Sequence, residues 1–258
     1  MTAIIEIAPG SVTPALRALL WKEGFTYRRF PTVLEGTAGG RILTDNPAAP
    51  TWMAVHEMSE DGTLMLSGTF DRDLVGAIID RLRSERRVTL GLEPNDPLRA
   101  LVPQPSRAGH DMDFDDRDPS VDLEPLGEPP ADLRLARIDH ALEPHCLWTP
   151  WMFTDGHTAV ERGIGYCLLD GDEVVSEAYA GPETNGELEM AVITRDGYRR
   201  RGLGTVVAAR TVLNCERNGF HTWWNTSLDN VGSASIARSL GYRSERHYQT
   251  LVWEKTER

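Results

Sequence analysis

The spacing of apolar and polar residues is most informative in the second half of the chain. Two apolar runs flank Asp170-Gly171, a dipeptide that tolerates the positive φ values of tight turns, so we predict a β-hairpin there. Between residues 205 and 217 apolar positions recur at helical spacing, and Asn218-Gly219 is typical of a helix end. The pattern predicts the order hairpin, strand, helix, strand, helix, strand. The predicted strands are Gly163–Leu169, Val174–Tyr179, Glu187–Thr194, His221–Thr226 and Gln249–Trp253, and the predicted helices are Thr205–Arg217 and Ser233–Leu240.

The first half shows the same two periodicities but no group of residues that suggests catalysis. Residues 12–24 read as an amphipathic helix, and two apolar runs joined by Asp45-Asn46-Pro47 indicate a pair of strands. A strand at Thr63–Phe70 and a helix around Asp73–Glu85 follow. The glycines at positions 36, 39 and 40 precede a strand instead of opening a helix, so we interpret them as turn residues.

Charge is unevenly distributed along the 258 residues, which carry a formal net charge of −12. This balance disfavours a nucleic-acid partner, because neutralising phosphates requires a basic face. Residues 106–132 hold nine acidic residues against two arginines, together with four prolines. We interpret this segment as a solvated linker between an N-terminal domain, 1–105, and a C-terminal domain, 133–258. Attraction of a cationic substrate is the alternative explanation of the acidity.

Composition predicts a cytoplasmic protein without a metal site or a membrane partner. The three cysteines, Cys146, Cys167 and Cys215, are too few and too scattered for a disulfide framework or a zinc site. No stretch reaches the roughly 18 apolar residues that a membrane-spanning helix needs, and the N-terminus lacks the basic start of a signal peptide. Cys215 lies within the predicted helix and is expected to be a buried, small apolar residue.

An arginine-rich and glycine-rich segment, Arg195–Gly204, lies between a predicted strand and a predicted helix. Its glycines let backbone N–H groups approach a ligand, and the helix that follows presents unpaired N–H groups and the positive end of its dipole. Four arginines and one aspartate make this segment basic within an acidic protein. The combination predicts a site for a phosphate or pyrophosphate. A dinucleotide-binding motif is excluded because Val207 stands where a small residue is needed, and there is no Walker A loop.

The pattern Arg199-x-x-Gly202-x-Gly204 resembles the acetyl-CoA pyrophosphate loop of the GNAT N-acetyltransferase superfamily. A second block, Asn230-x-x-Ser233-x-x-Ile236-x-x-x-Leu240-Gly241-Tyr242, is similar to a later helix of the same family. The resemblance covers about residues 135–258. It is strongest to a subgroup that includes relatives of the zwittermicin self-resistance acetyltransferase, with Glu189, Thr194, Tyr198 and Trp224-Asn225 also in place. It implies an α/β (α+β) protein: a GNAT fold with a mixed, mostly antiparallel sheet, preceded by a degenerate GNAT-like half.

The resemblance also implies roles for individual residues in binding acetyl-CoA. Backbone N–H groups of residues 200–205 would bind the pyrophosphate, and residues 192–194 would pair with the pantetheine arm. An N–H group of Val192 or Ile193 would polarise the thioester carbonyl. Asn230 and Ser233 would lie beside the pantetheine and the sulfur. The residues implied to bind acetyl-CoA are Val192, Ile193, Thr194, Arg199, Arg200, Arg201, Gly202, Leu203, Gly204, Thr205, Asn230 and Ser233.

Acetyl transfer to an amine needs a base, because the amine is protonated in water. The resemblance points to Glu189, with Glu187 as its competitor. The family's usual proton donor to the leaving thiolate is a tyrosine, but Ala237 stands at that position. Tyr248, Tyr242 and Ser233 are substitutes by side-chain type, and we choose Tyr248.

The sequence therefore predicts an acetyl-CoA-dependent N-acetyltransferase whose acceptor is a primary amine of a small molecule, such as an antibiotic or a polyamine-like metabolite. A protein or peptide N-acetyltransferase and a catalytically silent acyl-CoA-binding protein are the alternatives. A homodimer is neither required nor excluded. The tryptophans and the phenylalanine that could line an acceptor pocket are equally typical of a core; they are Trp148, Trp151, Phe153, Trp223 and Trp224.

Overall fold

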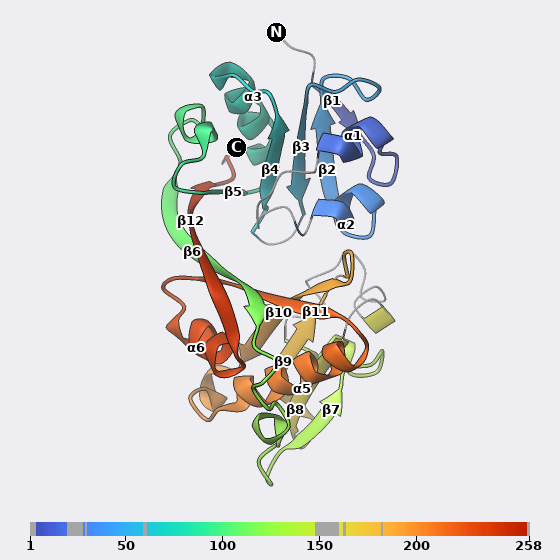
Figure 1. The fold of residues 1–258 in the computed structure, drawn as a ribbon, viewed down its shortest axis with the longest axis vertical. Helices are drawn as coiled ribbons and strands as arrows, with labels where there is room; N and C mark the ends of the chain where they lie inside the picture. The colour runs from blue at the N-terminus through green and yellow to red at the C-terminus, as the bar shows by residue number, and fades with distance from the viewer. Residues whose placement is uncertain are drawn as a thin grey trace. The chain divides into compact units, whose positions relative to one another are not determined.

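The computed structural model describes residues 4–19, 28, 30–58, 61–147, 160–161, 164–181 and 183–256. The chain divides into two compact units. Unit 1 consists of residues Met1–Asp111 and His247–Arg258, and unit 2 consists of residues Met112–Arg246. Two strands contribute residues to both units, β6 (Arg107–Arg117) and β12 (Tyr242–Trp253) (Figure 1).

The segment 106–132 differs from the solvated linker that its composition predicts. Residues 107–117 form β6, in which Met112 and Phe114 are buried in the core of unit 2, at 3% and 0% exposure. Aspartates at alternate positions of this strand lie on its other face and dominate the composition of the segment, which conceals the period-two pattern. The division between the units falls inside β6, and residues 247–258 cluster with unit 1 instead of with the predicted domain 133–258.

The described elements of unit 1 are β1 (Ile5–Ile7), α1 (Pro14–Leu19), α2 (Phe30–Glu35), β2 (Gly40–Thr44), β3 (Trp52–Glu57), β4 (Leu64–Gly68), α3 (Arg72–Arg83), β5 (Val88–Leu92) and the 3-10 helix η2 (Pro97–Ala100). The strands β1-β2-β3-β4 form an antiparallel sheet in this order. Trp52 and Ala54 of β3 pack in one apolar cluster with α3, whereas Met53 and Val55 pack in another with α1 and α2. Burial on both faces explains why β3 is a continuous apolar run and not an alternating one.

The sequence predictions for unit 1 are confirmed where the structure describes them, with one exception. The strand pair around Asp45-Asn46-Pro47 is β2 and β3, and the helix around Asp73–Glu85 is α3. The predicted helix over 12–24 appears as α1, and its last five residues lie outside the described residues. Helix α2 is the exception, because its apolar residues Val33 and Leu34 read as the start of a strand.

The described elements of unit 2 are η3 (Pro125–Gly127), β7 (Arg134–Arg137), η4 (Glu143–His145), β8 (Ile164–Asp170), β9 (Glu173–Ala180), β10 (Glu187–Thr194), η6 (Asp196–Tyr198), α5 (Leu203–Arg217), β11 (His221–Ser227) and α6 (Val231–Ser239). The hydrogen-bonded order of the large sheet is β5-β12-β6-β11-β10-β9-β8-β7. The pairs β7–β8, β8–β9 and β9–β10 are antiparallel, whereas β10–β11 is parallel. This confirms the predicted α/β fold with a mixed, mostly antiparallel sheet.

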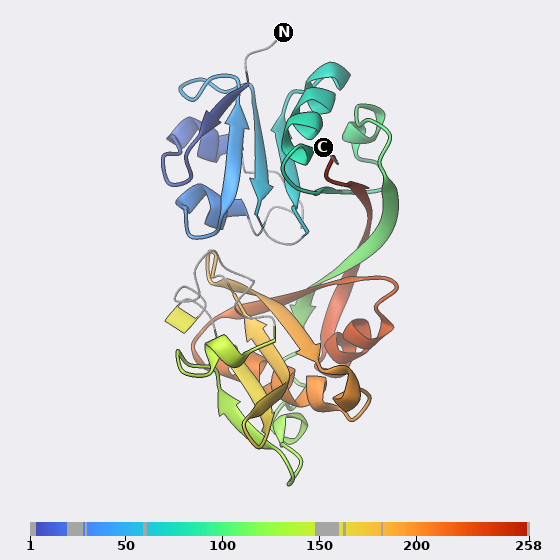
Figure 2. The same ribbon diagram turned by 180° about the vertical axis from the view of Figure 1, so that it is seen from behind.

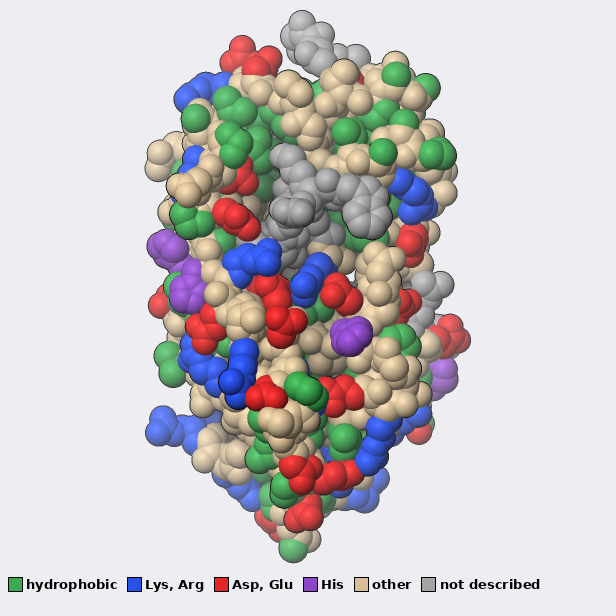
Figure 3. Space-filling model, in the orientation of Figure 1, with side chains coloured by type: hydrophobic (Ala, Val, Ile, Leu, Met, Phe, Trp, Pro, Cys, Tyr) green, Lys and Arg blue, Asp and Glu red, His purple; other side chains and the backbone are tan. Residues whose placement is uncertain are grey.

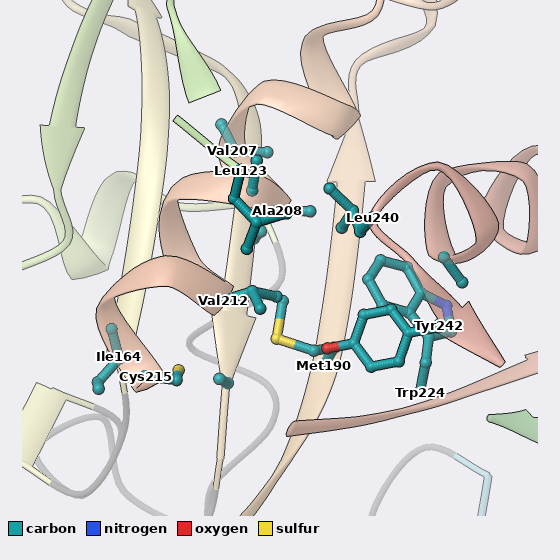
Figure 4. Close-up of a cluster of buried hydrophobic side chains, with 14 of the residues drawn as sticks. Leu123, Ile164, Met190, Val207, Ala208, Val212, Cys215, Trp224, Leu240 and Tyr242 are labelled. Atoms are coloured by element: carbon teal, nitrogen blue, oxygen red, sulfur yellow. The ribbon is translucent and has the colours of Figure 1, made fainter. Parts of the chain in front are cut away.

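Helix α5 packs on one face of β8, β9 and β10 (Figures 1 and 2). Its Val207, Val212 and Cys215 are fully buried, and they gather with Met190 of β10 and Trp224 of β11 in the core of unit 2 (Figure 4). The expectation that Cys215 is a buried apolar residue is therefore confirmed. Trp224 belongs to the core, whereas Trp148, Trp151 and Phe153 lie outside the described residues.

The two units share one order of elements. In unit 1, β1 is followed, after the short helices α1 and α2, by the antiparallel strands β2, β3 and β4, helix α3 and strand β5. Among the described elements of unit 2, β7 is followed, after η4, by β8, β9, β10, α5 and β11. The strand after the helix is parallel to the strand before it in both cases: Thr63 bridges Thr89 in parallel in unit 1, and β10 is parallel to β11 in unit 2. The units are therefore topological repeats that the sequence alone does not reveal.

Charged side chains of both signs are interspersed on the face shown in Figure 3. Within the part of the chain that the structure describes, no helix is long and apolar enough to cross a bilayer.

Candidate functional site

The loop between β10 and α5 has the geometry of an anion site. Residue Gly202 is the N-cap of α5 with φ 78°, no side chain caps the helix, and its first turn contains no acidic residue. Arg200 also has a positive φ, of 64°. The N–H groups in the first turn of a helix carry partial positive charge, so the start of α5 offers hydrogen-bond donors to an anion, although the Thr205 N–H already donates to the Gly202 carbonyl at 3.0 Å.

Glycine is present at positions 202 and 204 of the loop for different structural reasons. The left-handed conformation of Gly202 favours glycine, and a Cβ atom there would meet nothing within 4 Å, so the space in front of it is open. A Cβ atom on Gly204 would lie 2.9 Å from Cδ1 of Ile236 and 3.5 Å from Oγ1 of Thr194. Gly204 therefore allows α5 to pack closely against α6 and β10, and only Gly202 leaves room for a ligand.

The arginines of the loop are held by neighbouring carboxylates. Arg199 pairs with Asp196 at 3.0 Å, Arg201 pairs with Asp132 at 3.0 Å, and Arg195 pairs with Glu173 at 3.2 Å. Within the described residues Arg200 makes no ion pair, and its side chain is exposed. The loop thus keeps a free guanidinium at Arg200 beside the uncapped helix.

Strands β10 and β11 separate beside this loop. Their parallel register runs from Glu187 opposite His221 to Met190 opposite Trp224, whereas β10 continues to Thr194 and β11 to Ser227. On their other side, Val192, Ile193 and Thr194 pair with β9, opposite Ala178, Glu177 and Ser176. One edge of residues 192–194 is therefore outside the β10–β11 ladder and can pair with an extended ligand.

Glu189 lies one residue before this separation. Leu188 and Met190 point into the core beneath α5, so Glu187 and Glu189 occupy the opposite face of the sheet. Glu189 is half-buried, and its carbonyl accepts a hydrogen bond from the Gly181 N–H at 3.0 Å. Glu187 stands roughly 7 Å further from the gap, at two residues of strand rise. The position of Glu189 favours it over Glu187 as the base.

The side chains of Asn230 and Ser233 already have structural partners. Asn230 caps α6, with its Oδ1 accepting a hydrogen bond from the Ser233 N–H at 3.1 Å. The Ser233 hydroxyl accepts from Trp224 Nε1 at 2.9 Å. These contacts fix the start of α6 next to β11, and contact of either residue with a ligand stays a prediction.

The candidates for a proton donor differ in their surroundings. Tyr242 is fully enclosed: its hydroxyl bonds Thr222 Oγ1 at 2.5 Å, its ring meets Trp224 edge-on at 5.6 Å, and burial raises its pKa. Tyr242 is therefore a core residue. Ala237 is also fully buried in this core, so the position is part of the packing between α6 and the sheet. Tyr248 is buried in the part of β12 that belongs to unit 1, and its role as proton donor stays a prediction.

Sequence reasoning missed two residues that share the face of Glu189, Tyr179 and Asp113, and it named Asn225 only for the resemblance. Tyr179 of β9 is paired with Ala191, is 2% exposed, and has its pKa raised by burial. Asn225 Nδ2 donates a hydrogen bond at 2.6 Å to Oδ1 of Asp113 on β6. The only sequence signal for Asp113 is the alternation with Met112 and Phe114, which the acidic composition obscures.

Comparison with known proteins gives concordant matches. A model of the family described as GNAT acetyltransferase matches residues 23–251. The uncharacterized N-acetyltransferase YdfB of Bacillus subtilis (strain 168) is 32% identical over 87 residues, which are 34% of this chain and 33% of that protein. The chain thus matches about a third of the length of this curated relative.

Solved structures share the fold over nearly the whole chain. A GCN5-related N-acetyltransferase-like protein from Streptococcus suis 89/1591 superposes with a TM-score of 0.73 at 23% identity, over 93% of this chain and 97% of that one. An acetyltransferase of the GNAT family from Colwellia psychrerythraea superposes with a TM-score of 0.61 at 10% identity, over 98% of this chain and 100% of that one. At these identities the likeness is one of fold.

Proposed function

The chain belongs to the GNAT acetyltransferase family, and from this premise we propose that it transfers the acetyl group of acetyl-CoA to a primary amine of a small molecule. The observation that carries the proposal is the separation of β10 and β11 after Met190 and Trp224, next to the uncapped start of α5. A pantetheine arm can pair with an extended strand edge, and a pyrophosphate can bind at an anion site next to that edge.

The residues around this gap fit acetyl-CoA. Backbone N–H groups of residues 200–205 would hold the pyrophosphate, because Gly202 leaves open space and neither a side-chain cap nor a first-turn acid competes. The free edge of residues 192–194 would pair with the pantetheine arm. The exposed guanidinium of Arg200 would add positive charge, and Arg199 and Arg201 would add less because they pair with Asp196 and Asp132. Asn230 and Ser233 would flank the arm from the start of α6.

In the proposed reaction Glu189 takes a proton from the acceptor ammonium, directly or through water. The freed amine attacks the thioester carbon and an N–C bond forms. The C–S bond then breaks, the thiolate leaves, and the nitrogen loses a second proton, so the products are the amide and the thiol of coenzyme A. Assignment of thiolate protonation to Tyr248 rests on its side-chain type alone, and a thiolate leaves tolerably without an acid. Glu187 and Asp113 lie on the same face of the sheet as Glu189, which supports an acceptor that carries positive charge.

We assign the single acetyl-CoA site to unit 2 and propose that unit 1 is a degenerate repeat of the same fold. Helix α3 occupies in unit 1 the place of α5, but Asp71 Oδ1 accepts a hydrogen bond from the Leu74 N–H at 2.8 Å, and Asp73 lies in the first turn. Two carboxylates at this helix start would repel a pyrophosphate. A two-unit chain with one active half is also the arrangement of the subgroup around the zwittermicin self-resistance acetyltransferase, to which we assign this chain. Because acetyl-CoA is made inside cells, the proposed reaction belongs in the cytoplasm.

Acetyl-CoA-dependent thiol release tests the proposal, with a panel containing a monoamine, a diamine, an amino sugar and a lysine-bearing peptide. Release that depends on a small amine and is lost in Glu189→Gln supports it. Release with the peptide alone favours a peptide N-acetyltransferase, and acetyl-CoA binding without release with any amine favours a silent acyl-CoA-binding protein. Either of these outcomes contradicts the proposal.

A further inference from the structure

The loop that precedes α5 is attached to the hairpin formed by β8 and β9. The Tyr198 hydroxyl donates a hydrogen bond to Oδ2 of Asp170, the last residue of β8, at 2.7 Å. Arg195 donates its backbone N–H to the Val175 carbonyl at 2.9 Å and its Nε to the Val174 carbonyl at 2.7 Å. Residues of β8 and β9 thus hold the loop before α5, whose regular structure is limited to the three residues of η6.

Tyr198 is the centre of these contacts. Its ring packs against the apolar core of unit 2, and the guanidinium of Arg201 lies 5.6 Å from the ring centroid. Arg201 in turn pairs with Asp132 at 3.0 Å. The hydrogen bond to Asp170 raises the pKa of the Tyr198 phenol, so the hydroxyl remains protonated and continues to donate. Tyr198 therefore connects the turn of the hairpin to the residues that immediately precede α5.

The backbone between Tyr198 and α5 needs such support. Arg200 has φ 64° and Gly202 has φ 78°. A left-handed conformation is strained for a residue with a Cβ atom, such as Arg200, and it persists only where the surrounding contacts hold it. A loop free to relax would lose the φ values at Arg200 and Gly202, and with them the directions of the N–H groups that they set.

We propose that Tyr198, held by Asp170, is a positioning residue that keeps the N–H groups of residues 200–205 oriented for the pyrophosphate of acetyl-CoA. This inference rests on the proposed function and adds a role for the β8–β9 turn in donor binding. Tyr198 acts through the backbone of the loop and has no part in the proton transfers. Its loss raises the dissociation constant for acetyl-CoA and leaves turnover at saturation unchanged.

The test compares Tyr198→Phe, Asp170→Ala, their double variant and the conservative Asp170→Asn, by calorimetry with acetyl-CoA and by steady-state kinetics. We expect the first three to raise the acetyl-CoA Kd by about 5- to 10-fold, with the double variant no worse than either single one. Asp170→Asn keeps a carbonyl acceptor for the phenol and retains near-normal Kd. In all four, kcat and the KM for the acceptor stay within about 2-fold, a split that general destabilisation does not produce.

Tyr166→Phe is the matched control. Tyr166 of β8 also has one phenol hydrogen bond with a side chain of unit 2, accepted from Asn214 Nδ2 at 3.1 Å, but Asn214 lies near the C-terminal end of α5, far from its start. The Kd of this variant should equal that of the wild type. Unchanged Kd in Tyr198→Phe, or an equal rise in Tyr166→Phe, overturns the positioning role while leaving the proposed function intact. Wild-type protein that fails to bind acetyl-CoA overturns the proposed function and this role with it.

Discussion

Asp71 and Gly202 are the N-cap residues of equivalent helices in the two units, and only Asp71 closes its helix with a side chain. Both helices follow a strand and precede a strand parallel to it. The Asp71 carboxylate bonds the Leu74 N–H in α3, whereas Gly202 leaves the start of α5 to a ligand. One residue at a repeated position thus separates a helix start that is internally satisfied from one that can bind an anion.

This difference predicts one acetyl-CoA per chain. Calorimetric titration of the full chain should fit a single class of sites with a stoichiometry near one, because the carboxylates of Asp71 and Asp73 disfavour a phosphate at α3. In the variant Asp71→Ser the hydroxyl still caps α3 and Asp73 remains in its first turn, so the stoichiometry should stay near one. A stoichiometry of two in the wild type would show that unit 1 is not degenerate.

Glu189→Gln isolates the role of the base. The substitution keeps the shape and the polar atoms of the side chain but removes its basicity. We expect kcat to fall by about 10²- to 10⁴-fold at neutral pH, with the acetyl-CoA Kd unchanged. The deficit should shrink as the pH approaches the pKa of the amine, since free amine then forms without help.

Glu187→Gln is the control for this measurement, because Glu187 lies on the same face of the same strand but further from the gap. It should retain most of the wild-type kcat. If the losses of the two variants are exchanged, Glu187 is the base; if Glu189→Gln also loses acetyl-CoA affinity, Glu189 is structural.

Because His56 is buried, we predict that the free energy of unfolding falls in mild acid. It is 1% exposed on β3, its Nε2 lies 3.2 Å from the Arg87 carbonyl, and burial lowers its pKa from 6.5 to about 4. Between these values the unfolded chain binds a proton that the folded chain does not. Stability from this group is therefore complete above pH 6.5 and falls as the pH drops toward 4, by about 3 kcal/mol in all.

Urea unfolding at pH 7 and at pH 4.5 measures this effect. The wild type should lose more unfolding free energy between the two values than His56→Gln, which does not titrate. The difference should be about 2–3 kcal/mol. Equal losses in the two proteins would show that His56 is not a buried neutral base.

Arg117 should be a main stabiliser of unit 2. Its side chain is 7% exposed, forms two hydrogen bonds with the Glu216 carboxylate at 2.5 and 2.8 Å, and donates to the carbonyls of Asp118, Val121 and Leu240. Arg117→Met removes the donor to the Glu216 carboxylate and to the Val121 and Leu240 carbonyls, while the Asp118 carbonyl still accepts from the Val121 N–H, so we expect a loss of about 3 kcal/mol of unfolding free energy.

Arg243→Met is the matched control, because Arg243 pairs with Asp118 at 2.6 Å but its side chain is 67% exposed. An exposed pair of this kind contributes at most about 1 kcal/mol. Thermal and urea unfolding of both variants give the comparison. Similar losses of unfolding free energy in the two variants would contradict the prediction that Arg117 is a main stabiliser of unit 2.

The elements of unit 2 follow closely from the sequence where local signals decide the outcome. Strand β10 has the predicted bounds Glu187–Thr194, and α5 begins two residues before the predicted Thr205 and ends at Arg217 as predicted. The Asp170-Gly171 turn and the Asn218-Gly219 end both contain a glycine at positive φ. Such signals are local, because a turn or a helix end requires particular residues at particular positions.

The structural features that the sequence did not predict depend on contacts between distant segments of the chain. Strand β6 is a strand because Met112 and Phe114 find a core that other elements provide, and its aspartates gave the segment the composition of a linker. The loop of the site is a contiguous motif and was predictable. Asp113 is hydrogen-bonded to Asn225, which lies 112 residues later in the sequence, and Tyr179 lies on the same face of the sheet but on a third strand. No spacing of residues along the chain predicts such contacts.

The most direct test of the account is the acetyl-CoA affinity of Gly202→Asn, measured by calorimetry against Gly219→Asn. Both glycines have a left-handed conformation, φ 78° and 80°, and open space where a Cβ would stand, at the two opposite ends of α5. Asparagine tolerates this conformation better than other residues, so both variants should fold with similar small losses of stability. If residues 200–205 bind the pyrophosphate, Gly202→Asn raises the Kd by at least about 10-fold and Gly219→Asn leaves it unchanged. Equal affinity in the two variants would contradict the assignment of the site to the start of α5.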